Sequence, residues 1–296
     1  MNKKILVTGA DGLVASRLVK LNRRWRLLTP GLDEFDLTKP EQVKRYIREN
    51  LPDLIINFAA FTDVGKAEEE RGKKDGLCWK VNVEGVRCLI VAKGKTRLIQ
   101  ISTDMVFSGG EKDPGPYEEE HLLPDSADEV SWYGWTKNQG EKIASDAGGT
   151  VVRIIYPIKA KLDIKQDYIH RPLILLKEDR LYPLFYDQFV SFTFIDELCE
   201  ALEIIIKREI NGIFHVSSDV FSPYELVKYA ADKTGMGSKT IKKGSVVEFL
   251  KTQKNKSRYP VKGGLKTKKS EEKLRMKFSK WKEVVDKMVE QGLTLA

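Results

Sequence analysis

The sequence predicts an α/β fold: a Rossmann-like doubly wound parallel sheet with a smaller C-terminal α/β substrate lobe. Up to about residue 155, short and continuously apolar runs alternate with longer amphipathic runs, which is typical of βαβ units whose strands are covered on both faces. A glycine-containing turn directly follows the first apolar run, where such sheets bind phosphate groups.

The same pattern places the individual elements. Strands are expected at residues 4–8, 25–28, 54–57, 97–101, 150–154 and 212–216. Helices are expected at 12–22, 40–50, 75–93, 131–147, 163–178, 196–208, 222–234 and 279–291. The regularity breaks after Tyr156-Pro157. We therefore predict an NAD(P)-binding Rossmann domain over 1–156 and a mostly substrate-binding lobe over 157–296, with some segments of the lobe returning to the sheet.

Composition excludes several classes of protein. The 296 residues contain no apolar run near the roughly 18 residues of a membrane span, and the first such run stops at Gly9, too early for a signal peptide. We therefore expect a cytoplasmic protein with no membrane partner. Cys78, Cys88 and Cys199 share no metal-ligand spacing and are interpreted as packing residues. No metal is expected.

The net charge of +8 comes from one segment, because residues 251–282 contain 13 Lys or Arg against Glu271 and Glu272. Such a segment could bind nucleic acid. Apolar residues recur at helical spacing beneath the charges, however: Leu274, Phe278, Trp281, Val284, Val285 and Met288. We therefore interpret the charges as a solvated face and predict no nucleic-acid partner. The acidic, proline-rich stretch 109–129 is expected to form a mobile loop beside the active site.

The turn after the first strand has the spacing Gly-x-x-Gly-x-x-Ala. Gly9 and Gly12 would let the backbone approach a pyrophosphate, and Ala15 would permit close packing of the following helix. A merely structural turn is the alternative. The position of this turn after a hydrophobic strand at the N-terminus favours a dinucleotide site.

The end of the second strand bears on the choice of cofactor. An acidic residue there selects NAD and a basic one selects NADP. Thr29 occupies roughly that place, with Arg23, Arg24 and Arg26 nearby. We therefore expect NADP(H) to be favoured, with NAD(H) as the alternative. Asp36 could contact the adenine, or it could be a turn residue before the second helix.

Tyr133 and Lys137 supply the pattern Tyr-x-x-x-Lys, and a spacing of four residues places both on one face of a helix. An ammonium group near a phenol favours the phenolate, so we expect Lys137 to lower the pKa of Tyr133. Tyr133 could then exchange a proton with a carbonyl or alcohol oxygen.

Position distinguishes this pair from two others with the same spacing. Only Tyr133 follows the fourth strand, whose end carries Ser102-Thr103-Asp104 at the carboxyl edge of the sheet, and Thr103 could donate a hydrogen bond to the substrate oxygen. Tyr224/Lys228 and Tyr229/Lys233 are interpreted as surface residues of a later helix. The three histidines are scattered, so no nucleophilic triad or metal cluster is indicated.

With these motifs in place, nearly the whole chain resembles the dTDP-4-dehydrorhamnose reductase family, a branch of the extended short-chain dehydrogenases that reduces 4-keto nucleotide sugars. The marks of the resemblance are Val7-Thr8-Gly9 with Gly12, Asp36-Leu37-Thr38, the run from Pro52 to Val64, Val81-Asn82-Val83, the run from Ile101 to Phe107, Tyr133-Gly134 with Lys137, Asp187-Gln188, Phe192-Thr193, the run from Gly212 to His215, and Arg258-Tyr259-Pro260.

The resemblance implies roles for particular residues. The catalytic set would be Thr103, Tyr133 and Lys137. The predicted cofactor-binding residues are Gly9, Asp11, Gly12, Leu13, Asp36, Leu37, Phe58, Ala59, Ala60, Thr62, Ser102, Tyr133, Lys137 and Tyr156. The predicted substrate-binding residues are Thr62, Val64, Val106, Phe107 and Thr193. The family usually uses NADPH, sometimes NADH, and its members are often homodimers.

The sequence also departs from the family pattern. Met105 replaces the tyrosine usual after Ser-Thr-Asp, and Gly65 stands where an acidic residue follows Val64. The segment between Thr103 and Tyr133 is longer than is typical, and Tyr156-Pro157-Ile158 lacks the expected glycine. The catalytic residues are retained while the substrate wall differs, so the sugar and its nucleotide stay open.

The sequence therefore predicts an NAD(P)H-dependent reductase of a nucleotide-linked 4-keto-6-deoxy sugar, in which Tyr133 supplies the proton. A nucleotide-sugar epimerase or dehydratase with retained NAD(P) is one alternative, although Asp104-Met105 matches the acidic pair of the dehydratases poorly. A non-catalytic regulatory subunit with this fold is another, and the presence of Thr103, Tyr133 and Lys137 counts against it.

Overall fold

The computed structural model describes residues 3–162, 164, 166–253 and 259–293. Its contacts divide the chain into two compact units. The first unit comprises the chain up to Val106, Leu122–Arg153 and Leu202–Phe214, and the second comprises Phe107–His121, Ile154–Ala201 and the chain from His215 on. Each unit is described by itself.

The unit boundaries differ from the predicted break after residue 156. The chain passes to the second unit after Arg153, and the segment Phe107–His121 already belongs to that unit. Tyr117 explains this assignment, because it forms a β-bridge with Leu265 of the same unit. Leu202–Phe214 returns to the first unit.

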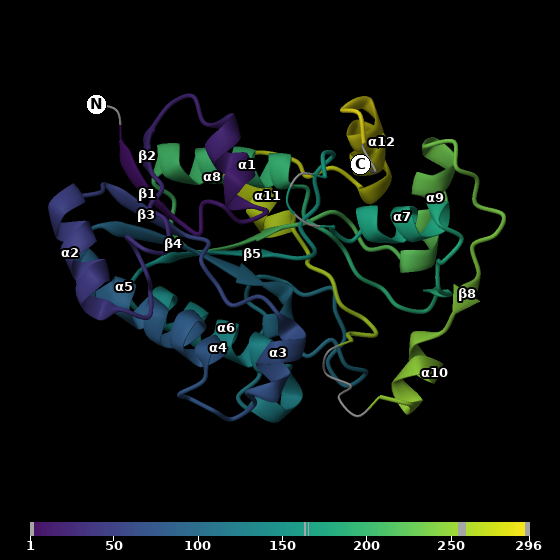
Figure 1. Ribbon diagram of the computed structural model, residues 1–296, viewed down its shortest axis with the longest axis horizontal. Helices are drawn as coiled ribbons and strands as arrows, with labels where there is room; N and C mark the ends of the chain where they lie inside the picture. The colour runs from purple at the N-terminus through teal and green to yellow at the C-terminus, as the bar shows by residue number, and fades with distance from the viewer. Residues whose placement is uncertain (1–2, 163, 165, 254–258, 294–296) are drawn as a thin grey trace. The chain divides into compact units, whose positions relative to one another are not determined.

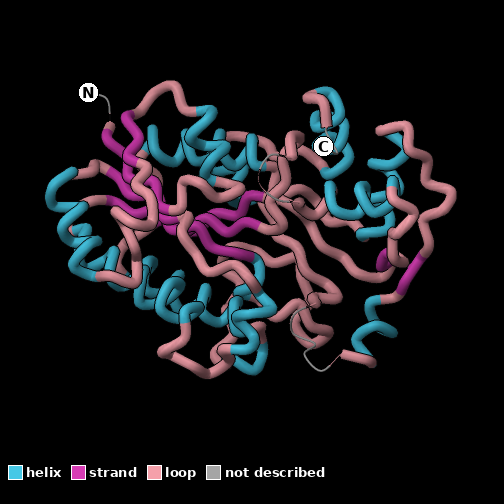
Figure 2. The backbone as a smooth tube through the Cα atoms, in the orientation of Figure 1, coloured by secondary structure: helices cyan, strands magenta, loops and turns pink. Residues whose placement is uncertain are grey.

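The first unit contains a six-stranded sheet with the order β2-β1-β3-β4-β5-β7. Its strands are β1 (Lys4–Thr8), β2 (Arg26–Leu28), β3 (Leu54–Asn57), β4 (Arg97–Thr103), β5 (Thr150–Ile154) and β7 (Ile213–Val216), the last of which continues into the second unit. β1 pairs in parallel with β2 and β3, and β3 pairs in parallel with β4. Figure 2 shows the strands as one magenta group. The predicted α/β fold is confirmed.

Helices cover the sheet of the first unit. They are α1 (Ala15–Leu21), α2 (Pro40–Asn50), α3 (Val64–Glu69), α4 (Leu77–Trp79), α5 (Gly85–Lys93) and α6 (Trp132–Asp146). Figure 1 shows α2, α5 and α6 on one face of the sheet and α1 on the other. Leu6, Ile55 and Leu98 of the strands pack with Val43, Leu89 and Ala144 of the helices in one buried cluster.

Two helices of the first unit differ from the expected ranges. The predicted helix 75–93 is interrupted by a π-helical turn, η1 (Lys80–Glu84), between α4 and α5. A π turn contains an extra residue that hydrophobic periodicity does not signal. The predicted helix 12–22 begins at Ala15, because the chain from Gly9 to Val14 forms turns. Short 3₁₀ turns, η2 (Asp104–Val106) and η3 (Ala127–Glu129), precede α6.

The second unit consists mainly of helices and loops (Figure 2). Its elements are α7 (His170–Lys177), β6 (Leu184–Phe185), α9 (Pro223–Lys233), β8 (Lys243–Gly244), α10 (Val246–Lys251), α11 (Lys268–Leu274) and α12 (Trp281–Glu290), and α8 (Ile195–Arg208) runs from this unit into the first. β6 and β8 pair in parallel. The predicted helix 163–178 begins only at His170, because the Asp167 carboxylate accepts the backbone N–H groups of Ile169 and His170.

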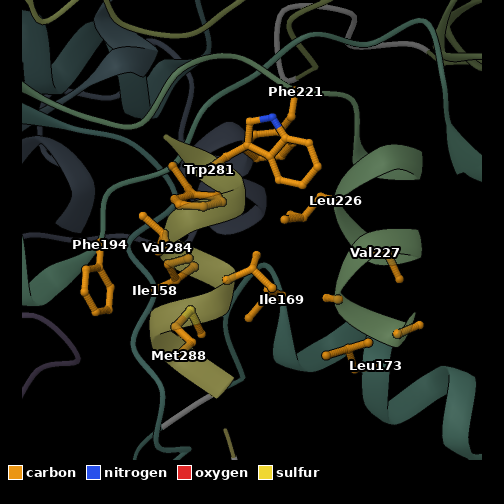
Figure 3. Packing of buried hydrophobic residues seen from close by; sticks show 14 of the residues in the cluster. Ile158, Ile169, Leu173, Phe194, Phe221, Leu226, Val227, Trp281, Val284 and Met288 are labelled. Carbon is orange, nitrogen blue, oxygen red and sulfur yellow. The ribbon is translucent and has the colours of Figure 1, made fainter. Parts of the chain in front are cut away.

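Where the structure describes it, the lysine-rich segment leads into a helix that packs in the core of the second unit. Trp281, Val284, Val285 and Met288 of α12 are buried in the core of the second unit, beside residues such as Leu226 and Phe221 (Figure 3). Lys273, Lys277 and Lys282 are exposed, as predicted for a solvated face. Residues 254–258, including Arg258 of the sequence motif, lie outside the described residues.

The stretch 109–129 is anchored rather than free along its length. Tyr117 and Glu119 are buried, and the Ser270 backbone N–H donates to Glu119 Oε1 within the second unit. Proline and glycine content gave no sign of these two anchors.

Two further predictions concern the part of the chain that the structure describes. Each of its helices is too short or too polar to cross a membrane. Cys78, Cys88 and Cys199 are buried, as expected of packing residues.

If α12 is part of the core, Met288→Ala should destabilise the protein by about 2–5 kcal/mol, the usual cost of truncating a buried side chain of this size. Urea denaturation followed by intrinsic fluorescence measures the change. Glu290→Ala, on the exposed side of the same helix, is the matched control and should leave the denaturation midpoint unchanged. Equal midpoints for the two variants would contradict the assigned packing.

Candidate active site

A row of buried polar side chains crosses the carboxyl ends of three parallel strands. Thr8 Oγ1 at the end of β1 donates to Asn57 Oδ1 at 2.6 Å, and Asn57 Nδ2 at the end of β3 donates to Gln100 Oε1 at 2.8 Å. Gln100 Nε2 of β4 then donates to the Ile101 carbonyl at 2.9 Å. These bonds fix the ends of the strands relative to one another, at the edge where open α/β sheets bind ligands.

Lys137 reaches this edge from α6. Its Nζ donates to the same Ile101 carbonyl at 2.7 Å, and the side chain is 6% exposed. Burial lowers the pKa of Lys137 to about 8, and the Glu141 carboxylate opposes that shift. The ammonium of Lys137 is therefore held at a defined point and titrates near physiological pH.

Tyr133 lies one helical turn before Lys137 and is 9% exposed. Burial raises its pKa well above the ordinary value, and the Asp104 carboxylate adds to the shift, whereas interaction with the Thr103 side chain opposes it. The expected lowering of this pKa by Lys137 is therefore wrong, because desolvation is the largest influence on it. Burial thus favours the protonated form of Tyr133.

The start of α6 is held close to the chain that leaves β4. The hydroxyl of Ser131 accepts the Gly134 backbone N–H at 3.1 Å and caps the helix. A Cβ atom at Gly134 would lie 2.0 Å from the Met105 carbonyl oxygen. Only glycine permits this approach, which accounts for the Tyr133-Gly134 pair in physical terms.

Thr103 ends β4 and is buried. Its hydroxyl donates to Asp104 Oδ1 at 3.1 Å and accepts the Met105 backbone N–H at 3.2 Å. Burial raises the pKa of Asp104 to about 7, although its hydrogen bonds oppose the shift. Thr103, Tyr133 and Lys137 thus belong to the same two elements of the first unit, β4 and α6, and to the same carboxyl edge.

Sequence reasoning assigned no role to Asn82, which the π turn directs inward. Its side chain accepts the Phe61 N–H at 2.9 Å and donates to the Phe61 carbonyl at 3.1 Å and to Thr136 Oγ1 at 3.0 Å. Cys78 Sγ also lies 3.3 Å from Thr136 Oγ1. Asn82 therefore joins the chain after β3 to the helix of Tyr133 and Lys137. The Val-Asn-Val motif was the available signal.

A second set missed from the sequence is the ion pair of Glu141 and Arg153. Both side chains are buried, and Ser102 Oγ donates to Glu141 Oε2 at 2.7 Å. Ser102 was predicted to bind the cofactor, and its hydroxyl is instead directed at this carboxylate. The spacing of Tyr133, Lys137 and Glu141 at every fourth residue was the available signal.

The glycine turn predicted to bind a pyrophosphate is tightly packed at its first glycine. Gly9 has φ +63°, and a Cβ atom there would lie 3.0 Å from the Ala59 backbone. The Gly12 N–H donates to the Gly9 carbonyl at 3.1 Å. Asp11 and Gly12 are exposed, and no side chain caps the start of α1. Leu13, also predicted to bind the cofactor, is buried.

Asp36 and Leu37 have local roles in the structure. Asp36 Oδ1 accepts the Thr38 N–H and hydroxyl at 2.9 and 2.7 Å. Partial burial would raise the pKa of Asp36, but these bonds and Lys39 lower it overall. The geometry matches the turn interpretation of Asp36. Leu37 is buried in the core against Gly85.

The arginines expected near the adenosine ribose are partly engaged. Arg24 forms an ion pair with Glu203 at 2.9 Å, and Arg23 donates to the backbone carbonyls of Lys20 and Asn22. Arg26 and Thr29 are exposed.

The remaining predicted residues of the first unit follow β3 and β4. Phe58, Ala59 and Ala60 follow the carboxyl end of β3, and all three are partly exposed. The Ala59 N–H donates to Thr8 Oγ1 at 3.1 Å. Thr62 is exposed, whereas Val64 begins α3 and packs against the cluster that contains Tyr133. Val106 is fully buried.

Three predicted residues belong to the second unit. Phe107 is buried and stacks on Tyr117 with ring centroids 4.2 Å apart. Tyr156 has φ +35° and stacks on Tyr168 at 4.2 Å. Thr193 is fully buried, accepts the Ile155 N–H at 2.9 Å and donates to the Val216 carbonyl at 2.6 Å.

The two other Tyr-x-x-x-Lys pairs do not form a buried polar site like that of Tyr133 and Lys137. On α9, Lys228 lies 6.0 Å from the Tyr224 ring centroid and Lys233 lies 5.1 Å from that of Tyr229. Both lysines are exposed, as predicted for surface pairs. Over the described residues, no three His, Cys, Asp or Glu side chains are grouped so that they could hold a metal ion.

Comparison with known proteins is consistent with this geometry. The family model described as the RmlD substrate binding domain matches residues 3–294. A dTDP-4-dehydrorhamnose reductase of Sinorhizobium fredii is 31% identical over 72% of this chain and 72% of its own length. One of Burkholderia thailandensis is 30% identical over 73% of this chain and 72% of its own length.

Solved structures share the fold. A dTDP-4-dehydrorhamnose reductase of Bacillus anthracis in complex with NADP has a TM-score of 0.85 at 24% identity, covering 98% of this chain and 100% of that one. One of Clostridium acetobutylicum has a TM-score of 0.83 at 24% identity, covering 97% and 99%. From the family match and these relatives, the chain belongs to the dTDP-4-dehydrorhamnose reductase family, as its motifs predicted.

Proposed function

We propose that the protein is an NADPH-dependent reductase of a nucleotide-linked 4-keto-6-deoxy sugar. One observation carries the proposal: β4 and α6 bring Thr103, Tyr133 and Lys137 to one carboxyl edge, where a hydrogen bond holds Thr103 and another holds Lys137. The relatives named dTDP-4-dehydrorhamnose reductase support the same chemistry and indicate a dTDP-linked substrate.

The residues of the chain have distinct tasks in this reaction. Tyr133 donates its phenolic proton to the oxygen of the reduced carbonyl, and its raised pKa keeps that proton available. Thr103 has one O–H donor, which would turn from Asp104 to the same oxygen as negative charge develops there. Lys137 supplies a fixed positive charge that stabilises Tyr133 as it loses its proton.

The first unit also offers residues to hold the cofactor. Gly9 and Gly12 leave the backbone open to a pyrophosphate, and Phe58, Ala59 and Ala60 lie where the second half of a dinucleotide would extend. When bound, NADPH supplies the hydride. The Bacillus anthracis structure in complex with NADP supports this choice of cofactor.

We also propose a cytoplasmic location, which the free thiols of Cys78 and Cys88 support because reducing compartments keep cysteines unpaired. Only the family resemblance supports a homodimer, which stays a prediction.

Replacing Tyr133 by phenylalanine should reduce kcat for dTDP-4-keto-6-deoxyhexose at least roughly 100-fold, because general-acid catalysis contributes about that much. NADPH oxidation followed at 340 nm measures it. Tyr224→Phe and Tyr229→Phe are matched controls with the same Tyr-x-x-x-Lys spacing, and they should retain wild-type kcat. Unchanged turnover in Tyr133→Phe would overturn the assignment.

The same assay separates the reductase from the epimerase and dehydratase alternatives. A reductase consumes one equivalent of free NADPH per sugar, whereas enzymes that retain the cofactor through their cycle consume none. Product formation without loss of free NADPH would exclude the proposed reaction.

Gly9→Ala should weaken NADPH binding about 10-fold or more, because a methyl group at Gly9 would meet the Ala59 backbone at 3.0 Å in the turn assigned to the pyrophosphate. Titration of NADPH fluorescence gives Kd. Gly72→Ala is the control, since Gly72 also has a positive φ of +81° but nothing lies within 4 Å of the added methyl group. Equal Kd values for the two variants would show that the turn does not belong to the cofactor site.

The rate should depend on pH through Lys137. Its pKa is lowered to about 8, so the ammonium is present below that pH and is lost as pH rises through it. We therefore expect kcat to fall above a pH of about 8. Measurement of kcat from acid to alkaline pH, with folding checked by circular dichroism at each pH, tests this. A rate that stays constant through this range would contradict the role of the Lys137 charge.

A further inference from the structure

The helix that carries Tyr133 and Lys137 carries a third buried polar side chain in the same register. Glu141 follows Lys137 by four residues, as Lys137 follows Tyr133, so the three side chains share one face of α6. Glu141 is only 3% exposed, and the proposed proton transfer makes no use of it. A carboxylate so deeply buried requires a specific partner.

That partner is Arg153 of β5, which is 1% exposed. Its Nε lies 3.1 Å from each oxygen of the Glu141 carboxylate, and its Nη2 bonds Glu141 Oε1. The planar guanidinium matches the carboxylate in two positions, which fixes the orientation of both groups. α6 is thereby tied to β5.

The same carboxylate is tied to the end of β4. Ser102 Oγ donates to Glu141 Oε2 at 2.7 Å, and Ser102 stands between Ile101 and Thr103 in the strand. The carbonyl of Ile101 accepts Lys137 Nζ at 2.7 Å. Two successive residues of β4 are therefore held by two successive turns of α6, immediately before Thr103.

Glu141 also acts on the charge of Lys137. Burial lowers the pKa of Lys137, and Glu141 and Cys78 raise it again. Two other charged groups lie near this face: Asp104 raises the pKa of Tyr133, and Arg153 is ion-paired with Glu141. Glu141 is thus the larger of the two opposing influences that preserve the ammonium form.

We propose that Glu141 and Arg153 form a positioning pair for the active site, which holds Ser102, and with it Thr103, in place. Glu141 has a second task, because its negative charge lies one helical turn from Lys137 on the same face of α6. The inference rests on the proposed function, because it assigns the pair to the same proton transfer. Neither member of the pair touches the reacting atoms.

Two variants separate the two tasks. Ser102→Ala removes the link to β4 and leaves the ion pair intact. The double variant Glu141→Leu, Arg153→Met removes both charges together, because loss of one partner alone would leave a buried charge unpaired, whereas apolar replacement of a whole pair often preserves the fold. Lys142→Gln, which removes an exposed charge from the same turn of α6, is the matched control.

For Ser102→Ala, we expect kcat to fall roughly 10- to 100-fold through misplacement of Thr103, with an unchanged Kd for NADPH and an unchanged alkaline limb of the pH profile. For the double variant, the alkaline limb should move to lower pH, because the loss of Glu141, which raises the pKa of Lys137, outweighs the loss of the Arg153 charge on β5. The ¹³Cε resonance of Lys137 in lysine-labelled protein, assigned with Lys137→Met, should titrate at a correspondingly lower pH.

The outcomes distinguish this inference from the proposed function. A wild-type protein that turns over the sugar, together with a Ser102→Ala variant whose kcat equals that of Lys142→Gln and a double variant whose Lys137 titration is unchanged, would overturn the positioning pair alone. A wild-type protein that oxidises no NADPH would refute the proposed function, and the Lys137 resonance would still report the electrostatic effect of Glu141. If the double variant fails to fold, Ser102→Ala decides the positioning role.

Discussion

The carbonyl oxygen of Ile101 is the point on which the candidate active site depends. It accepts a hydrogen bond from Gln100, which ends the polar row across β1, β3 and β4, and another from Lys137 of the catalytic helix. One backbone group thus joins the sheet edge to α6. Because an unpaired buried donor would be costly, each member of this network constrains the next, and the ends of the strands cannot shift independently of the helix.

The three ionisable groups at this edge show how burial sets their chemistry. Desolvation raises the pKa of Tyr133 and of Asp104 and lowers that of Lys137, so burial shifts each group toward its neutral form. A phenol that holds its proton at neutral pH can protonate an oxygen during the reduction.

The sequence was sufficient to predict the strands of the sheet and the residues that lie at its carboxyl edge. Apolar runs bounded by polar residues place β1, β3 and β5 at the predicted positions, because strands buried on both faces leave a clear signal. Other features were not predictable from the sequence alone. The partnership of Glu141 with Arg153 depends on how α6 packs on β5, and the direction of the pKa shift of Tyr133 depends on how much water the fold excludes. Spacing predicts that two side chains share a face, but it does not predict their solvation.

The π turn at Lys80–Glu84 limits the changes in chain length that the fold can tolerate. Each residue of an α-helix turns the chain by roughly 100°, so loss of the extra residue would rotate Leu77–Trp79 by about that angle relative to α5. Cys78 would then face away from Thr136, and Asn82 would no longer reach Phe61. A single-residue deletion is harmless in many surface loops, but at this point it would disconnect the chain after β3 from the catalytic helix.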